Sequence, residues 1–229
     1  MSKAGNASLG VHETSFKEQP AWKYELLFQT SGLIEKVFSM RDTIECFYSK
    51  APKLLFSSKR TNDGGYYSVD NLTFSYGEEE KVAIRSHRYT LTRTKLDTVL
   101  TTKGKVFDML AATMYLRSID WDNLQHGDEF PFEVAIGRDV VKARFRYTGQ
   151  RIVTRNEVKY STRHFYIDIF DEAFVNAKEA AEVWIGDDAN HIPVKVRSKL
   201  KIGAAEVYYT GSENLRAPMT SRVVLPKRY

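Results

Sequence analysis

The chain has 229 residues, of which 42% are hydrophobic, enough for one large β domain or two small ones with a substantial core. The formal net charge of +5, from 34 basic and 29 acidic residues, permits an acidic partner but requires none. The one cysteine, Cys46, excludes an intrachain disulfide and a cysteine-rich metal site. No run of about 18 apolar residues is present, so we expect no transmembrane segment.

The first hundred residues predict a succession of β-strands. Residues 22–29 alternate, with Trp22, Tyr24 and Phe28 on one face, which is the period of a half-buried strand. The segment Asp63-Gly64-Gly65 supplies the positive φ angles of a hairpin turn. The thirteen Tyr, thirteen Phe and three Trp also favour strands over helices.

The period changes at residues 105–117, which are rich in helix formers. Val106, Leu110 and Met114 recur at helical spacing within this segment. We therefore expect a helix of three to four turns, roughly as long as thirteen residues allow. Its apolar residues lie nearly all round, so it should pack against the predicted sheet.

The second half returns to strand periodicity. Residues 140–147 alternate between apolar and basic side chains, and further strands are predicted over 152–158 and 160–170. A short helical turn is expected near 171–181. Residues 183–203 then form a hairpin around the acidic turn Asp187-Asp188.

The expected fold is therefore mainly all-β. We predict an antiparallel meander that forms an open or closed barrel or a sandwich, with the helix packed against it. No linker rich in Pro, Gly or Ser divides the chain, so residues 1–217 are expected to form a single barrel-like domain. Residues 218–229 carry Arg222, Lys227 and Arg228 with no acid and are expected to be a loose tail.

No motif in the sequence names a reaction. The nucleophile elbow, the zinc-binding H-E-x-x-H and the glycine-rich phosphate loops are absent. The five histidines are scattered, and the acidic turn lacks the ligand spacing of a calcium loop. We predict no catalytic residues, no metal site and no cofactor, and the chain is expected not to be an enzyme.

Two sets of side chains are candidates for binding. The first is a basic ladder on two strands, which could dock a polyanion or an anionic lipid, or could be an ordinary solvated sheet face. Its residues are Lys142, Arg144, Arg146, Lys195, Arg197, Lys199 and Lys201. Exposed aromatic residues that could stack on bases are not interleaved with these cations, so nucleic acid is not an expected partner.

The second set is apolar and is expected to point to the interior. It could line a cavity for a lipid or another amphiphile, or it could be a filled core. Its residues are Trp22, Tyr24, Phe28, Phe145, Tyr147 and Phe165. The sequence leaves both alternatives open.

Short segments in a particular order resemble a known family. The chain is similar to the bacterial exported family catalogued as domain of unknown function 3108, in its Bacteroidales form, over residues 3–217. The resemblance is carried by Ala21-Trp22-Lys23-Tyr24, Thr30-Ser31-Gly32-Leu33-Ile34-Glu35-Lys36, Met40-Arg41-Asp42-Thr43, Phe107-Asp108-Met109-Leu110, Tyr115-Leu116-Arg117, Gly127-Asp128, Val183-Trp184-Ile185-Gly186-Asp187-Asp188 and Ile192-Pro193.

The resemblance implies export to the periplasm or outer envelope and a YmcC-like meander. It brings no catalytic residues. Members usually carry a signal peptide and an extra strand before a segment like Lys3-Ala4-Gly5-Asn6-Ala7-Ser8-Leu9, so we expect the natural start to lie upstream of Met1.

We therefore expect a non-enzymatic envelope protein that binds a lipid, another amphiphile or an envelope component. The second hypothesis is an assembly protein in surface polysaccharide or envelope biogenesis that uses the basic ladder. The third is a hydrolase whose site matches no known motif. The sequence does not name the ligand, the partner or the oligomeric state.

Overall fold

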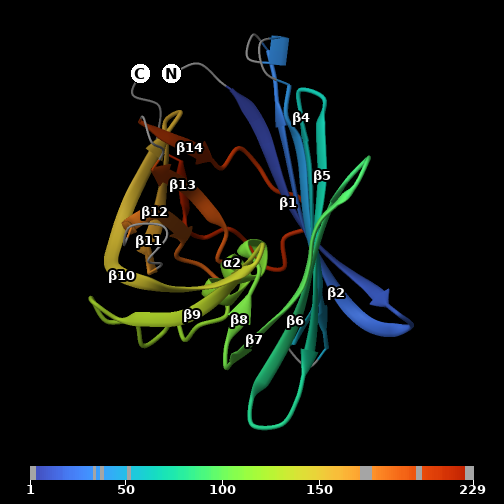
Figure 1. Ribbon diagram of the computed structural model, residues 1–229. Helices are drawn as coiled ribbons and strands as arrows, with labels where there is room; N and C mark the ends of the chain where they lie inside the picture. Colours follow the sequence, from blue (N-terminus) through green and yellow to red (C-terminus); the bar gives the residue numbers. More distant parts are fainter. Residues whose placement is uncertain are drawn as a thin grey trace. The chain divides into compact units, whose positions relative to one another are not determined.

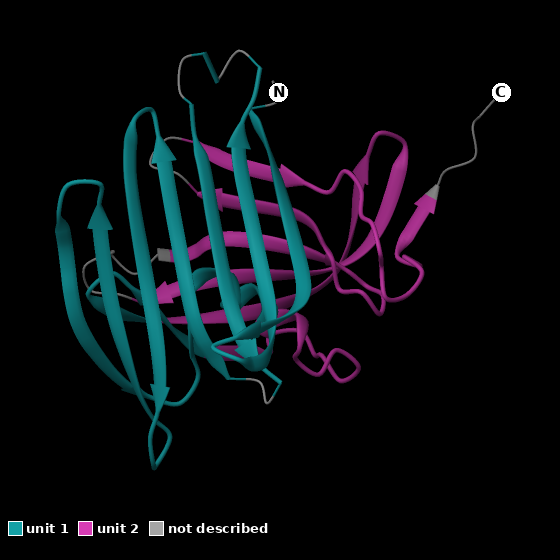
Figure 2. Cartoon of the chain, turned by 90° about the vertical axis from the view of Figure 1, so that its right-hand side faces the viewer, with its two compact units in different colours: residues 1–114, 132–141 teal, residues 115–131, 142–229 magenta. Residues whose placement is uncertain are grey.

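The computed structural model describes residues 4–32, 35–36, 39–50, 53–170, 177–199 and 203–224. The chain divides into two compact units, coloured separately in Figure 2. Unit 1 contains residues 1–114 and 132–141, and unit 2 contains residues 115–131 and 142–229. Strands dominate both units (Figure 1).

A seven-stranded antiparallel sheet forms most of unit 1. Its strands follow chain order from edge to edge, so each strand pairs with the next one along the sequence. This meander curls like half a barrel (Figure 2). The strands are β1 (Gly5–Phe16), β2 (Gln19–Thr30), β3 (Arg41–Ser49), β4 (Leu54–Asp63), β5 (Tyr66–Tyr76), β6 (Lys81–Thr90) and β7 (Thr94–Lys103).

A second sheet runs from β14 back to β8 in spatial order, and β15 pairs with β11 beside this path. All its described pairings are antiparallel except that of β8 with β9. The strands are β8 (Val106–Phe107), β9 (Glu129–Ile136), β10 (Asp139–Arg155), β11 (Val158–Phe170), β12 (Ala177–Gly186), β13 (Pro193–Lys199), β14 (Ala204–Tyr208) and β15 (Arg222–Val224).

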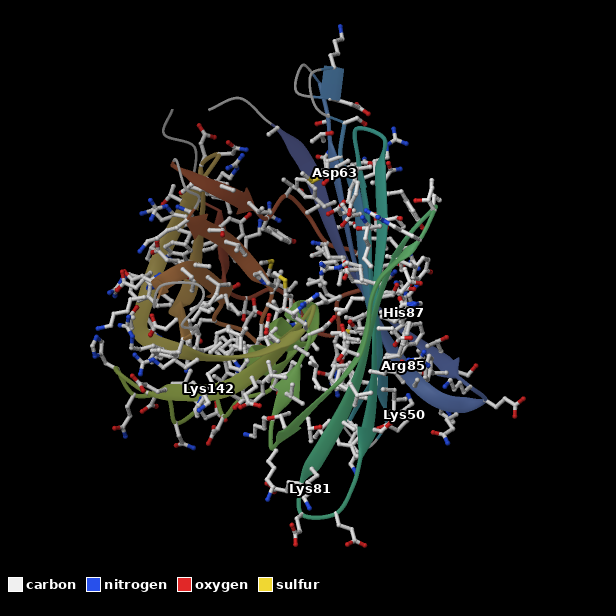
Figure 3. The ribbon with its side chains drawn as sticks, viewed as in Figure 1. Lys50, Asp63, Lys81, Arg85, His87 and Lys142 are labelled. Atoms are coloured by element: carbon white, nitrogen blue, oxygen red, sulfur yellow. The ribbon has the colours of Figure 1, made fainter. Side chains whose placement is uncertain are left out.

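The core of unit 1 lies on one face of the seven-stranded sheet, which we call the inner face. Cys46, Leu72 and Ile84 from three strands are buried there. Leu110 and Met114 of helix α2 (Met109–Arg117) pack against them. The opposite face is the outer face, from which Arg85 and His87 of β6 project (Figure 3).

Helix α2 confirms the predicted helix but begins four residues later than expected. Val106 and Phe107 form β8, which pairs in parallel with Glu133 and Val134 of β9. Asp108 then caps the helix, because its carboxylate accepts a hydrogen bond of 2.6 Å from the Ala111 amide. The expected start at residue 105 is therefore wrong, because Val106 and Phe107 form strand hydrogen bonds with β9 instead of the first helical turn.

The predicted helical turn near 171–181 is wrong over its described part. Residues 177–181 belong to β12, where Ala177 pairs with Ile169 and Ala181 with Ile167. Pairing on both sides of β12 outweighs the helix preference of the Ala- and Glu-rich sequence, as tertiary context often does. Residues 171–176 lie outside the described part of the chain.

Unit 2 has aromatic packing of its own. Val153, Tyr160 and Val194 form a buried cluster, and Trp121 packs edge-on against Phe165 with ring centroids 5.6 Å apart. The C-terminal residues, expected to be a loose tail, are anchored up to Val224. Ser221 is buried and β15 pairs with β11.

The mainly β, half-barrel fold is confirmed. The chain divides into two compact units, each with its own hydrophobic cluster. That residues 1–217 form a single domain therefore stays a prediction. No helix among the described residues is long and apolar enough to cross a membrane.

Candidate binding site

The predicted apolar lining falls into two sets on different units. Trp22, Tyr24 and Phe28 lie on the inner face of β2 in unit 1, all half-buried. Trp22 and Tyr24 pack against the core cluster, and Tyr24 meets Tyr48 edge-on at 5.4 Å between ring centroids. These two rings therefore contribute to a filled core.

The other three aromatic residues are buried inside unit 2. Phe145, Tyr147 and Phe165 are 2%, 6% and 0% exposed. Tyr147 and Phe165 lie 5.1 Å apart between ring centroids, and Phe145 packs near Tyr115. Their contacts are those of a packed interior, and their role as a ligand lining stays a prediction.

The basic ladder is interleaved with carboxylates in unit 2. Asp168 is fully buried and accepts hydrogen bonds from Arg144 Nε at 2.9 Å and Arg146 Nε at 3.3 Å. Burial alone would raise the pKa of Asp168, but the Glu179 amide and the two guanidinium groups outweigh it and lower that pKa. The two arginines therefore hold a buried carboxylate in its ionised form.

The β13 cations of the ladder are paired in the same way. Lys195 lies 3.0 Å from Glu206, and Arg197 lies 2.7 Å from Glu182. Lys199 approaches Glu179 at 3.8 Å. A polyanion docking here would have to compete with these carboxylates.

Two ladder residues stand apart from this network. Lys142 is exposed (Figure 3) and forms no ion pair with a residue that the structure describes. Lys201 lies outside the described residues. The ladder's role as a face for an anionic partner stays a prediction.

A buried histidine in unit 2 has the partners of a catalytic triad. His164 is 5% exposed, with its Nδ1 2.6 Å from Thr148 Oγ1 and its Nε2 3.2 Å from Glu182 Oε2. Burial lowers the pKa of His164 although Glu182 opposes this effect. Thr148 is the extra residue at a β-bulge, where β10 shifts register against β11. Thr148 is itself only 9% exposed, so the group is enclosed rather than open to a substrate.

The inner face of unit 1 carries a different arrangement. The register of the seven strands places one residue of each strand in a line, which we call the amphipathic row. From β1 to β7 its residues are Leu9, Leu26, Ile44, Lys59, Asp70, Arg88 and Leu96. An apolar half on β1–β3 thus adjoins a charged half on β4–β6.

The apolar half extends beyond the packed core. Leu26 and Ile44 pack against the core cluster, whereas Leu9 remains 38% exposed. Val11, which pairs with Tyr24 on the same face of β1, is 43% exposed. The edge strand β1 therefore presents apolar side chains to solvent at the apolar end of the row, with Leu26 and Ile44 between them and the charged half.

A pocket of about 330 Å³ lies at the charged end of the row. Its lining comes from β6, β7 and the turn between β9 and β10, all in unit 1. The lining residues are Arg88, Lys95, Leu96, Ile136, Gly137, Arg138 and Asp139. In the charged half of the row, Arg88 donates from Nε to Asp70, and Lys59 forms no ion pair with a described residue.

Sequence reasoning missed this pocket and the amphipathic row. The sequence assigns no role to residues 137–139, and Arg88 belongs to the predicted succession of strands with no role of its own. Lys95 stood in a stretch without a distinctive pattern. The row depends on register across seven strands, for which the sequence carries no direct signal.

The comparison with protein families decides the identity of the chain. The family model described as "Protein of unknown function (DUF3108)" matches residues 1–219. The chain belongs to this family. The family description assigns no activity to the DUF3108 chain.

A solved structure resembles this DUF3108 protein in fold. It is the "Crystal Structure of Beta-barrel-like Protein of Domain of Unknown Function DUF1849 from Brucella abortus", with a TM-score of 0.57 and 10% identity. The match covers 90% of this chain and 88% of the other. At that identity the likeness shows the fold alone. No curated protein matches the chain.

Proposed function

We propose that this DUF3108 protein is a non-enzymatic component of the cell envelope that binds an amphiphilic ligand on the inner face of unit 1. The observation that carries the proposal is the amphipathic row, in which exposed apolar side chains on β1 continue into cations on β4 and β6. A ligand with an apolar tail and an acidic head matches both halves of one row.

The apolar half of the row suits the apolar tail of a ligand, because leaving these side chains exposed to solvent costs free energy. Leu9 and Val11 are on the same face as the core cluster yet keep 38% and 43% of their surface in solvent. Covering apolar surface yields about 25 cal/mol per Å². An acyl or alkyl chain lying across β1 and β2 would gain this energy and would extend the core across the edge strand.

The charged half suits an acidic head. Lys59 and Arg88 lie on either side of Asp70 in the row. The Nε of Arg88 donates a hydrogen bond to the Asp70 carboxylate. The row therefore holds two cations and one carboxylate. Cations next to an apolar surface attract an anionic amphiphile by charge as well as by burial.

The absence of enzyme activity is part of the same proposal. Its support is the enclosure of the Thr148–His164–Glu182 group, whose histidine ring is also packed 4.5 Å from Trp184. A substrate needs access to a nucleophile or base, and Thr148 and His164 are only 9% and 5% exposed. We expect no hydrolysis of ester or amide substrates by the purified protein.

We further propose a periplasmic or outer-envelope location, a Bacteroidales type of the family and a YmcC-like fold. The support is the ordered set of segments from Trp22 to Pro193 that resembles the exported form of the family. Fractionation of native cells, followed by immunoblotting, tests the location. Protein found in the cytoplasmic fraction alone would contradict it.

The ligand proposal is tested with two matched variants. Val11→Asp places a charge on the inner face of edge strand β1, and Val99→Asp places the same charge on the outer face of edge strand β7, where Val99 is 63% exposed. Val11→Asp should weaken binding of dodecyl maltoside about tenfold or more, because a carboxylate is costly against an apolar tail. Val99→Asp should bind like the wild type, as measured by isothermal titration calorimetry.

Mass spectrometry of lipids that co-purify from native membranes provides the second measurement. We expect an amphiphile in wild-type and Val99→Asp preparations and a reduced amount with Val11→Asp. Equal binding by both variants, with no co-purifying lipid, contradicts the proposal. If charge reversal at Lys195 and Arg197 then abolishes binding of an envelope polysaccharide, the assembly hypothesis takes its place.

A further inference from the structure

We propose that the pocket lined by Arg88, Lys95 and Arg138 binds a phosphate or carboxylate group, the acidic head of the amphiphile. This inference rests on the proposed function, because it assigns the head of the ligand whose tail lies on the apolar half of the row. It adds Lys95 and Arg138, which lie outside the row itself.

A β-bulge aims Lys95 toward the pocket. Arg88 of β6 pairs with Leu96 of β7, but the next β6 residue, Tyr89, pairs with Thr94. Lys95 is therefore an extra residue without a partner in the ladder. Such an insertion bends the strand and redirects its side chain, which explains how Lys95 lines the same pocket as its neighbour Leu96.

The turn between β9 and β10 supplies the third cation. Gly137 has a φ of +60°, a conformation that favours glycine at the first position of a two-residue hairpin turn, and Arg138 follows at the tip. The Ser86 hydroxyl donates a hydrogen bond to the Gly137 carbonyl, which ties this turn to β6. A Cβ at position 137 would lie 3.4 Å from Arg88 Nη2. The turn and the guanidinium group are thus within van der Waals reach of each other.

The charges in the pocket favour an anion. Asp70 fixes the Arg88 guanidinium from outside the lining by accepting from Nε. Lys95 and Arg138 are exposed and form no ion pair with a described residue. Asp139 is the one acidic residue of the lining. Three cations against two carboxylates, Asp139 in the lining and Asp70 on Arg88, leave one net positive charge for a ligand.

The size and walls of the pocket narrow the ligand class. A volume of about 330 Å³ is at the small end for ligand sites, enough for a head group but not for a whole lipid. Leu96 and Ile136 form an apolar side of the lining. The strands of the row are about 4.8 Å apart, so a ligand of roughly 14 Å would connect Arg88 on β6 with Ile44 on β3, and one of roughly 24 Å would reach Leu9 on β1.

The test uses three probes below their critical micelle concentrations: dodecyl phosphate, dodecyl maltoside and inorganic phosphate. The variants are Lys95→Gln and Arg138→Gln, both at exposed positions, and the control is Lys103→Gln at an exposed position of the same strand β7. Calorimetry gives the affinity, and circular dichroism confirms that each variant is folded. Each pocket variant should weaken dodecyl phosphate binding about tenfold, the typical loss for a hydrogen bond to a charged group.

Dodecyl maltoside separates this inference from the proposed function. Its neutral head should make its binding insensitive to Lys95→Gln and Arg138→Gln. If both pocket variants bind dodecyl phosphate as tightly as the wild type, the pocket inference is wrong, while sensitivity to Val11→Asp would still support a tail site.

Inorganic phosphate distinguishes the source of the anion. Dodecyl phosphate should bind at least about tenfold more tightly than inorganic phosphate, because only the former buries an alkyl chain. Equal affinities for the two, both lost in Lys95→Gln, would support an anion pocket and contradict the amphiphile. If neither dodecyl phosphate nor inorganic phosphate binds, the inference is overturned.

Discussion

The ionisation of Asp108 should make the stability of this protein fall as the pH rises. Asp108 is 4% exposed at the N-terminus of α2, on the inner face of unit 1. Burial raises the pKa of its carboxyl from 3.8 to about 6, although hydrogen bonds from the Ala111 amide and the Ser57 side chain oppose this effect. The helix cap therefore carries a carboxylate that is costly to ionise.

The sign follows from proton linkage. The folded state keeps the Asp108 proton up to about pH 6, whereas the unfolded chain loses it near 3.8. Between these values the folded state binds more protons, so the free energy of unfolding decreases as the pH rises. A difference of about 2 pH units corresponds to about 3 kcal/mol, of which about 2 kcal/mol is lost between pH 4.5 and pH 8.

The perturbation is Asp108→Asn, which keeps an acceptor for the Ala111 amide and removes the ionisation, since asparagine is as good a cap as aspartate. Urea denaturation followed by tryptophan fluorescence at pH 4.5 and pH 8 gives the free energies of unfolding. The variant should equal the wild type within about 1 kcal/mol at pH 4.5 and exceed it by about 2 kcal/mol at pH 8. Other titrating groups cancel in the difference between the two proteins.

Asp120→Asn is the control, because Asp120 is an exposed carboxylate after α2 that accepts from the Asp122 amide. Its pKa is lowered rather than raised, so it should not reproduce the gain at pH 8. A pH-independent difference between Asp108→Asn and the wild type would refute the reasoning. A wild type that gains over the variant at pH 8 would show that the helix amides outweigh burial.

Two further variants test the network of unit 2. Asp168→Asn should destabilise the protein by about 3 kcal/mol at pH 7, because Arg144 and Arg146 lose a buried ionised partner. Since the pKa of Asp168 is lowered, its stabilisation is present above the unfolded pKa and lost as the pH falls, so denaturation at pH 3 should show a smaller loss than at pH 7. Asn190→Ala should cost about 2–3 kcal/mol, because Asn190 exchanges hydrogen bonds with the Ala217 amide and carbonyl. In Asn190→Ala, backbone hydrogen exchange at Arg222–Val224 should be accelerated more than in β10 and β12, the other strands that pair with β11. Unchanged protection at Arg222–Val224 would contradict the anchoring role of Asn190.

The strands could be predicted because their side chains alternate locally. In β10 the sequence predicted Val141, Ala143 and Phe145 on one face and Lys142 on the other, and the structure buries the first three and exposes the last. The reason is that solvent on one side and a core on the other impose a period of two. The same signal predicted the mainly β fold.

Errors arose where a distant partner decided the local structure. Val106 and Phe107 have helical spacing with α2, yet they pair with β9. The Ala-rich residues 177–181 favour a helix, yet β11 holds them as a strand. In both segments hydrogen bonds to a strand far along the chain outweigh a local preference of a few tenths of a kcal/mol per residue.

The candidate sites show the same division. The sequence determined which residues are basic, which are aromatic and which face each takes along its strand. The tertiary structure decided that Arg144 and Arg146 surround Asp168, and that Leu9 and Arg88 belong to one row. Alternation is a property of one strand, whereas ion pairs, rows and pockets depend on strand register, on bulges such as that at Lys95 and on turns such as that at Gly137.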